Sequence, residues 1–153
     1  MLLFAYGTLM DPDVRAFVLG RGGGPVTAAR LTGWRRAPVA GESFPMLVAD
    51  AGGAVDGLLV ELQSDGERER VQFFEGVRQV LAPVTAVCAT RGPIDALACL
   101  SGAGLVAGDG DWDLARWQAA HKARYLPATV EYMAGFGRHD VETALRLWSL
   151  RAP

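Results

Sequence analysis

Strand-like and helix-like segments are segregated along this chain, and that order restricts the fold more than any single motif does. Apolar runs rich in Val and Leu, broken by glycine-containing turns, dominate the first two thirds of its 153 residues. Helical spacing of apolar residues dominates the last third. This segregation predicts an α+β fold, in which a mixed sheet curls into a small β-barrel and helices pack outside it.

The predicted strands are short apolar runs bounded by glycine, proline or polar residues. They cover residues 2–5, 26–34, 44–49, 55–62, 80–90 and 95–100. Between the third and fourth runs, Ala51-Gly52-Gly53 is typical of a turn. Gly57, inside the fourth run, indicates a bulge in that strand.

Two helices are predicted among the strands from the residues near their ends. Residues 13–19 carry apolar side chains at helical spacing. Ser64 and Glu67 have the spacing of a capping box and predict a helix over residues 65–74. Gly76 follows it at a position where helix C-termini prefer glycine.

Three more helices are predicted in the last third, after a glycine-rich loop at residues 102–110. They are expected over residues 113–125, 127–134 and 141–150. Pro127 and Asp140 mark two of their starts.

The composition is that of one globular domain. Hydrophobic residues make up 50% of the chain, which is enough for one sizeable core, and no linker is long enough to divide it. We expect a single domain over residues 1–153, with a core of about residues 2–100 and a helical C-terminal extension of about residues 111–151.

The charge balance argues against several kinds of partner. Fifteen basic and 17 acidic side chains leave a formal charge of −2, whereas nucleic-acid surfaces need a basic excess. No basic run favours an anionic membrane, and no stretch approaches the roughly 20 apolar residues of a membrane-spanning helix. Because the N-terminal run is too short for a signal peptide, we expect a cytoplasmic protein. The sequence leaves the oligomeric state open.

Motifs for metals and cofactors are incomplete, so neither is expected. Cys88 and Cys99 lie in apolar, strand-like runs and are typical of buried reduced thiols rather than of a zinc site. The glycine-rich residues 20–25 lack the third glycine of a dinucleotide loop. Residues 109–113 begin like a calcium loop but lack its later glycine and acid, and a turn that caps the next helix is favoured.

Three further features carry no clear chemistry. Residues 41–45 lack the final glycine of a nucleophile elbow. His121 and His139 have no visible partner in the sequence and are interpreted as structural or solvated.

The segment Phe4-Ala-Tyr-Gly-Thr-Leu9 turns a strand abruptly into a loop. Gly7 permits a positive φ and leaves the neighbouring N–H groups open to a ligand. Asp11 and Pro12 then restart the chain as a helix. Exposed amides at such a turn predict a cradle for a small anion.

Glu75 stands at the C-terminus of a predicted helix, where the helix dipole disfavours an acid. Phe73 and Phe74 beside it are expected to desolvate the carboxyl, which would raise its pKa. That placement indicates a residue kept for chemistry. From the local sequence alone, however, a solvated glutamate is the favoured interpretation, and pairing with Arg78 is a further alternative.

Five segments in order resemble the γ-glutamylcyclotransferase-like superfamily. The resemblance covers roughly residues 2–100 and each motif alone is loose. The segments are Phe4-Ala-Tyr-Gly-Thr-Leu9, Ala29-Arg-Leu-Thr-Gly-Trp34, Phe44-Pro-Met-Leu-Val48, Val55-Asp-Gly-Leu-Leu59 and Phe74-Glu75-Gly76. The last corresponds to the segment that bears the catalytic glutamate in that superfamily.

This resemblance implies a cofactor-independent enzyme that acts on a small γ-glutamyl substrate. The α-amine of a γ-glutamyl group would attack its own side-chain amide, giving 5-oxoproline and a released amine or amino acid. Glu75 would be the general acid and base. The backbone N–H groups of Gly7, Thr8 and Leu9 would bind the α-carboxylate or the oxyanion, and Tyr6 would contribute its ring or hydroxyl.

The chain also departs from the family pattern. Gln72 replaces an aspartate, Leu58 replaces an acid, and Gln79 and Leu81 stand where many members have a Tyr-x-Arg pair. These changes support an alternative function, that of a catalytically altered or inactive member that binds small molecules or serves as an accessory protein. Tyr125 and Tyr132 are both candidates for a late tyrosine in the site.

Overall fold

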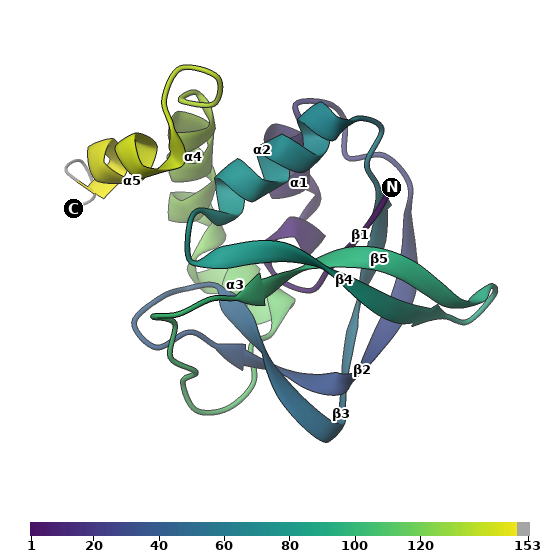
Figure 1. Cartoon of the computed structure of the whole chain (residues 1–153). Helices are drawn as coiled ribbons and strands as arrows, with labels where there is room; N and C mark the ends of the chain where they lie inside the picture. The colour runs from purple at the N-terminus through teal and green to yellow at the C-terminus, as the bar shows by residue number, and fades with distance from the viewer. Residues whose placement is uncertain (150–153) are drawn as a thin grey trace.

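The computed structural model describes residues 1–149, in which five strands form a closed ring with helices gathered on one side (Figure 1). The strands are β1 (Leu2–Ala5), β2 (Val26–Pro38), β3 (Pro45–Glu61), β4 (Gln79–Cys88) and β5 (Gly92–Ser101). The helices are the 3-10 turn η1 (Thr8–Met10), α1 (Pro12–Leu19), α2 (Asp65–Glu75), α3 (Leu114–Ala120), α4 (Lys122–Met133) and α5 (Val141–Ser149). The expected α+β fold is confirmed.

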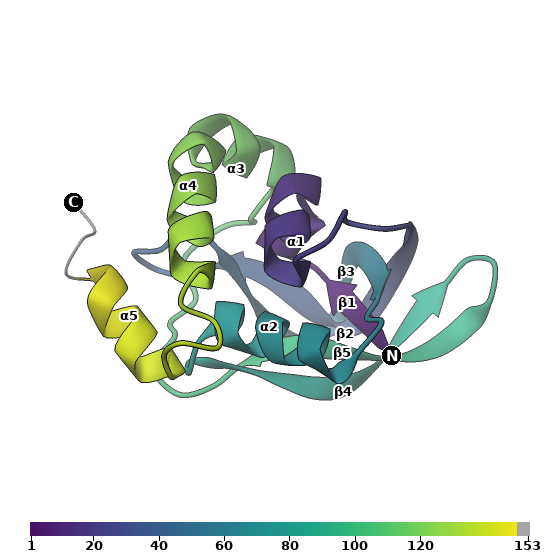
Figure 2. The ribbon, with the colours of Figure 1, turned by 90° about the horizontal axis from the view of Figure 1, so that it is seen from above.

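The ring runs in the order β1-β3-β2-β4-β5 and closes where β5 meets β1. Neighbouring strands are antiparallel except at this closure, where Leu3 pairs with Leu97 in parallel orientation. The sheet is therefore mixed, as expected. Helices α1, α2 and α4 lie on one side of the ring, while the tip of the β4–β5 hairpin extends away from them (Figure 2).

Strand β3 is one continuous strand of 17 residues, so the predicted turn at residues 51–53 is wrong. The partner strand explains why, since β2 pairs with β3 on both sides of that segment, at Trp34 with Ala49 and at Thr32 with Ala54. Residues 50–53 lie opposite Gly33, and the register shifts there. The glycines of the expected turn instead belong to a large bulge, which lets the two strands bend around the ring.

The bulge predicted at Gly57 is also wrong. Gly57 pairs in regular register with Ala29. A Cβ atom at this position would lie 2.5 Å from the Ala5 carbonyl oxygen and 2.6 Å from the Phe4 ring. Glycine is needed here because β1 passes too close for any side chain.

Helix α2 has the ends that its sequence predicts. The Ser64 hydroxyl accepts a hydrogen bond from the Glu67 N–H at 3.2 Å, and Gly76 ends the helix with φ of 74°. The Glu67 carboxylate does not complete the capping box. It accepts a hydrogen bond from the Gln63 N–H instead and forms an ion pair with Arg21.

The first two C-terminal helices divide at His121, not at the predicted Pro127. The backbone leaves helical geometry at His121, with φ of −124° and ψ of −29°, and α4 continues through Pro127. Asp113 caps α3 and Asp140 caps α5, as expected. The last residue of the predicted 141–150 helix lies outside the described residues. In residues 1–149, no helix combines the length and the apolar character needed to cross a membrane.

Candidate functional site

The loop after β1 is held in place by a buried acid. Asp11 is fully buried, and its carboxylate accepts hydrogen bonds from the N–H groups of Asp13 and Val14 at 3.0 and 3.1 Å. Gln118 and Lys122 reach the same carboxylate at 2.7 and 2.8 Å from α3 and α4. Asp11 therefore fixes the start of α1 and ties the C-terminal helices to the loop.

Gly7 does not have the positive φ expected from the sequence. Its φ is −124°, within the range of ordinary residues. A Cβ atom here would lie 2.9 Å from Cγ of Pro45. The glycine is required by the close approach of β3 to the loop, and not by the local turn.

The loop carbonyl groups are occupied, whereas its amides are open. Arg36 donates to the Tyr6 carbonyl at 2.9 Å, and Arg15 donates to the carbonyls of Leu9 and Met10 at 3.0 Å each. The Gly7 and Thr8 carbonyls accept from the backbone of Met10 and Asp11. Within the described residues, no hydrogen bond uses the N–H groups of Gly7, Thr8 or Leu9. The loop therefore has three donors left for a ligand.

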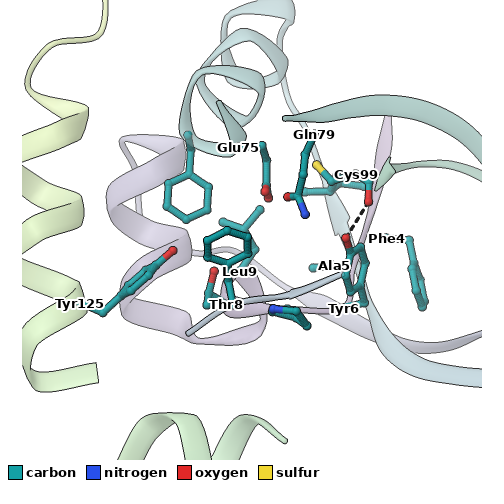
Figure 3. Close-up of a pocket in the computed structure, with 14 residues that line it drawn as sticks. Phe4, Ala5, Tyr6, Thr8, Leu9, Glu75, Gln79, Cys99 and Tyr125 are labelled. Carbon is teal, nitrogen blue, oxygen red and sulfur yellow. Dashed lines mark hydrogen bonds between the residues drawn. The ribbon is translucent and has the colours of Figure 1, made fainter. Parts of the chain in front are cut away.

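These residues line a cavity of about 80 Å³ together with Glu75 (Figure 3). Tyr6, Gly7, Thr8 and Leu9 supply one wall, and Glu75 enters from the C-terminus of α2. The rest of the wall is mostly apolar. It consists of Leu3, Phe4, Ala5, Phe44, Pro45, Phe74, Gln79, Cys99 and Tyr125.

Glu75 is half-buried and faces this cavity. Burial raises the pKa of its carboxyl to about 7, and a hydrogen bond from the Cys99 thiol opposes the rise. Arg78, the alternative partner considered for Glu75, forms its ion pair with Glu42 at 3.0 Å. A carboxyl with this pKa exchanges a proton near neutral pH, as a general acid and base must.

Cys99 is a site residue that the sequence did not indicate. Burial and the neighbouring Glu75 raise the pKa of its thiol well above the usual value, so the thiol stays protonated and donates to Glu75. The Tyr6 hydroxyl donates to the Cys99 carbonyl oxygen at 2.6 Å. Tyr6 therefore presents its ring to the cavity and uses its hydroxyl to brace β5.

Gln79 lies beside Glu75 (Figure 3) and is 3% exposed. Its Nε2 group has no hydrogen-bond partner in the described part of the chain. An unpaired buried amide costs free energy, so native proteins seldom keep one without a reason. In the sequence, Gln79 stands out only as the replacement of a tyrosine in the family pattern, and no signal marks it as a cavity residue.

Gln72, the other glutamine of this region, is a bracing residue. Its Nε2 group donates to the carbonyls of Gly76 and Gln79, at 3.2 and 2.8 Å. Its Oε1 atom accepts from the Leu81 N–H at 3.1 Å. These bonds hold the segment between α2 and β4, and so help to fix the position of Glu75.

Of the two candidate tyrosines, Tyr125 lines the cavity. It is hydrogen-bonded to the Thr8 side chain, and burial raises the pKa of its hydroxyl. The Tyr132 hydroxyl instead donates to the Phe73 carbonyl at 2.8 Å, and its ring stacks on Phe73. Tyr132 thus supports the helix that carries Glu75.

No group of three or more potential metal ligands occurs among residues 1–149. His121 and His139 are both exposed and lie outside the cavity. Asp113, the last residue of the acidic segment 109–113, caps the N-terminus of α3. The polar groups of the cavity are one carboxyl, the free loop amides, a thiol, a carboxamide and the hydroxyls of Thr8 and Tyr125.

Comparisons with known proteins agree on one family. A family model described as "Gamma-glutamyl cyclotransferase, AIG2-like" matches residues 3–114. AIG2-like protein B of Arabidopsis thaliana is 24% identical over 153 aligned residues, covering 94% of this chain and 88% of the relative. AIG2-like protein C of the same plant is 26% identical, covering 86% of this chain and 77% of the relative.

Solved structures share the fold. A solution structure of an Arabidopsis thaliana protein aligns with a TM-score of 0.63 at 23% identity, covering 90% of this chain and 84% of that one. A structure titled "Gamma-glutamyl cyclotransferase" aligns with a TM-score of 0.54 at 15% identity, covering 69% and 68%. At these identities the likeness is one of fold.

Proposed function

Because the chain belongs to the gamma-glutamyl cyclotransferase, AIG2-like family, we propose that it cyclises a γ-glutamyl group to 5-oxoproline and releases an amine or amino acid. One observation carries this proposal. A carboxyl whose pKa is about 7 lies in the same cavity as three loop amides that have no acceptor in the described chain. The cavity thus combines a group that moves protons with groups that bind an anion.

Glu75 is the proposed general base and acid. Its carboxylate takes a proton from the substrate α-ammonium, and the resulting amine attacks the side-chain amide carbon. A C–N bond forms, and an oxyanion develops on the carbonyl oxygen. Glu75 then protonates the leaving nitrogen as the old C–N bond breaks, and it passes the extra proton of the ring nitrogen to the released amine. The lactam nitrogen keeps one proton.

The loop amides are the proposed anion site. The N–H groups of Gly7, Thr8 and Leu9 would donate to the α-carboxylate or to the developing oxyanion, and donors fixed in advance need no reorganisation during the reaction. The free Nε2 group of Gln79 would donate to the same substrate from the opposite side. A bound substrate would thus satisfy the Gln79 carboxamide as well as the loop amides.

The catalytic effect would come from positioning and from proton transfer. Ring closure is intramolecular, and holding the reacting groups in line supplies much of the acceleration. Proton transfer by a well-placed carboxyl typically adds 10²–10⁴-fold. Tyr6 and Tyr125 would confine the bent substrate between their rings.

A second candidate function is that of a non-catalytic small-molecule binder. It is favoured by the start of β4, where Leu81 and Gln79 replace polar and aromatic residues of the family pattern. The cavity would then bind a γ-glutamyl compound without turning it over.

The experiment is a direct assay of 5-oxoproline release from a panel of γ-glutamyl amines and amino acids. We expect turnover of at least one compound, and a loss of about 10²–10⁴-fold in kcat for Glu75→Gln. Glu69→Gln makes the same chemical change on the exposed face of α2 and should keep full activity. Absence of turnover throughout the panel would refute the enzyme function, and full activity of Glu75→Gln would refute the proposed role of Glu75.

A further inference from the structure

A second, outer chamber adjoins the cavity and shares part of its wall. It has a volume of about 210 Å³, compared with about 80 Å³ for the inner cavity. Five residues line both spaces, namely Phe44, Phe74, Glu75, Gln79 and Tyr125. The wall that the two spaces share therefore includes Glu75, the residue that the proposed reaction requires.

The outer chamber is built mainly from apolar side chains that come from separate parts of the chain. Leu105 lies in the loop after β5, Tyr132 on α4, and Leu145 and Trp148 on α5. Helix α5 lies beside α4, close to the segment where α2 ends and β4 begins (Figure 1). The family model matches residues 3–114, so the match does not include helices α4 and α5.

The mouth of this chamber is apolar as well. Val77 is 59% exposed and Trp148 is 41% exposed, and both line the chamber. Large apolar side chains that are exposed and line a cavity are typical of a surface that receives an apolar ligand.

The charges in the chamber are neutralised within it. Arg78 and Glu42 are both lining residues, and they pair with each other at 3.0 Å. Apart from Glu75, no other charged residue lines the chamber among the described residues. A ligand carboxylate would find no cation in the chamber that lacks a counter-charge, and it would lose hydration on entry.

The position of Glu75 determines which part of a substrate would occupy this space. The γ-glutamyl head group is proposed to bind at the loop amides in the inner cavity. Glu75 must also reach the leaving nitrogen, and it is shared by both spaces. The rest of the leaving group then extends past Glu75 into the outer chamber.

We propose that the outer chamber binds the leaving group and that this group is an amine whose substituent is bulky, apolar and without charge, aromatic or branched aliphatic. The inference rests on the proposed function for the direction of the substrate. It goes beyond that function because it names the class of compound that is released.

The test compares γ-glutamyl compounds that differ only in the leaving group, by kcat/KM for 5-oxoproline release. The γ-glutamyl derivative of benzylamine should exceed that of methylamine by at least about tenfold, since apolar groups of this size discriminate by that amount or more. Two charged compounds should each have a kcat/KM about tenfold below that of the benzylamine derivative. They are γ-glutamyl-phenylalanine, which adds a carboxylate to a similar ring, and ε-(γ-glutamyl)-lysine, which adds charges.

Two variants of the chamber should reduce the preference for the benzylamine derivative over the methylamine derivative. Trp148→Ala and Leu105→Ala remove apolar surface from different elements, and each should lower the ratio of benzylamine to methylamine substrate severalfold. Phe17→Ala is the control, because Phe17 is 46% exposed on α1 and lines neither space. It should leave the ratio unchanged.

Binding to Glu75→Gln, measured by calorimetry with the same compounds, separates this inference from the proposed function. If no compound is turned over but the benzylamine derivative binds more tightly than the methylamine derivative, the proposed reaction is wrong and the proposed ligand class of the chamber stands. If the compounds are turned over but the benzylamine derivative is not preferred to the methylamine derivative, the proposed reaction stands and the proposal of an apolar leaving group is wrong. If binding shows no preference for the apolar compound, the inference fails whatever the turnover.

Discussion

Two carboxyl groups in this protein have opposite surroundings, and the contrast shows how position on a helix and access to donors set their chemistry. Asp11 caps the N-terminus of α1, whereas Glu75 ends α2 at its C-terminus. Burial acts to raise the pKa of both groups. For Asp11 the hydrogen bonds from Lys122, Gln118 and Val14 outweigh burial, and its pKa is lowered.

Glu75 lacks such compensation. A thiol is the group that lowers its pKa, and burial prevails, so the pKa rises to about 7. Asp11 is therefore an anion at neutral pH that stabilises the structure, and Glu75 is a group that changes protonation near neutral pH. In this protein, a buried acid is structural where hydrogen-bond donors surround it and reactive where they do not.

The largest change in stability is expected from Asp11→Ala. This variant removes the cap of α1 and the buried partner of Lys122, and we expect a loss of about 2–4 kcal/mol in the free energy of unfolding. Because the folded pKa of Asp11 is lowered, the loss should be present at neutral pH and shrink as the pH falls through that pKa. Urea denaturation measures it.

Asp13→Ala is the matched control for this prediction. Asp13 also pairs with Lys122 at 2.7 Å, but its side chain is 59% exposed. Asp13→Ala should lower the free energy of unfolding by about 0.5 kcal/mol or less. Equal losses for the two variants would contradict the structural role of Asp11.

Glu75→Gln should have the opposite effect on stability. The folded pKa of Glu75, about 7, lies above the usual value of 4.5, so the parent protein is most stable below the usual value and loses stability as the pH rises through 7. The variant avoids burying that charge. At pH 8 we expect it to be about 1–3 kcal/mol more stable than the parent, and equally stable at pH 4.

Thermal unfolding at the two pH values measures this difference, with Glu69→Gln as the exposed control on the same helix. If parent and Glu75→Gln show the same dependence on pH, the carboxyl is not desolvated and the contrast with Asp11 disappears.

The two glutamines near Glu75 provide a smaller test. Gln79→Leu removes a buried amide that lacks a partner, so stability should stay equal or rise by about 1 kcal/mol, while substrate affinity falls about tenfold. Gln72→Leu removes three hydrogen bonds and should cost about 1–2 kcal/mol. Denaturation and ligand titration measure both quantities. A stability loss for Gln79→Leu as large as that for Gln72→Leu would show that Gln79 braces the fold.

The smallest effect is expected from Cys99→Ala. Its thiol lowers the pKa of Glu75, so its removal should move the acidic limb of the kcat/KM profile from about pH 7 to higher pH. The change in rate at pH 7 should be less than tenfold. Cys88→Ala, at the other buried cysteine, should leave the limb in place. A limb that stays fixed in Cys99→Ala, or moves to lower pH, would contradict the proposed donor role.

Much of the local structure was predictable because it depends on neighbouring residues. Asp11, Ser64, Asp113 and Asp140 cap helices as their spacing indicates. The pairing of β2 with β3 across residues 50–53 was not predictable, since the glycines there resemble a turn until a partner strand is placed beside them. Pro127 likewise resembles a helix start, yet it lies inside α4.

For the site, the sequence by itself determined the start of α1 after the loop and the helix end that carries Glu75, because proline, capping residues and the glycine at a helix C-terminus act within a few positions. Only the tertiary structure decided that these segments line one cavity, that Cys99 and Gln79 join them, and that α4 and α5 add an apolar chamber. Burial, and with it the pKa of Glu75, depends on contacts between residues far apart in the sequence. No local pattern can encode those contacts.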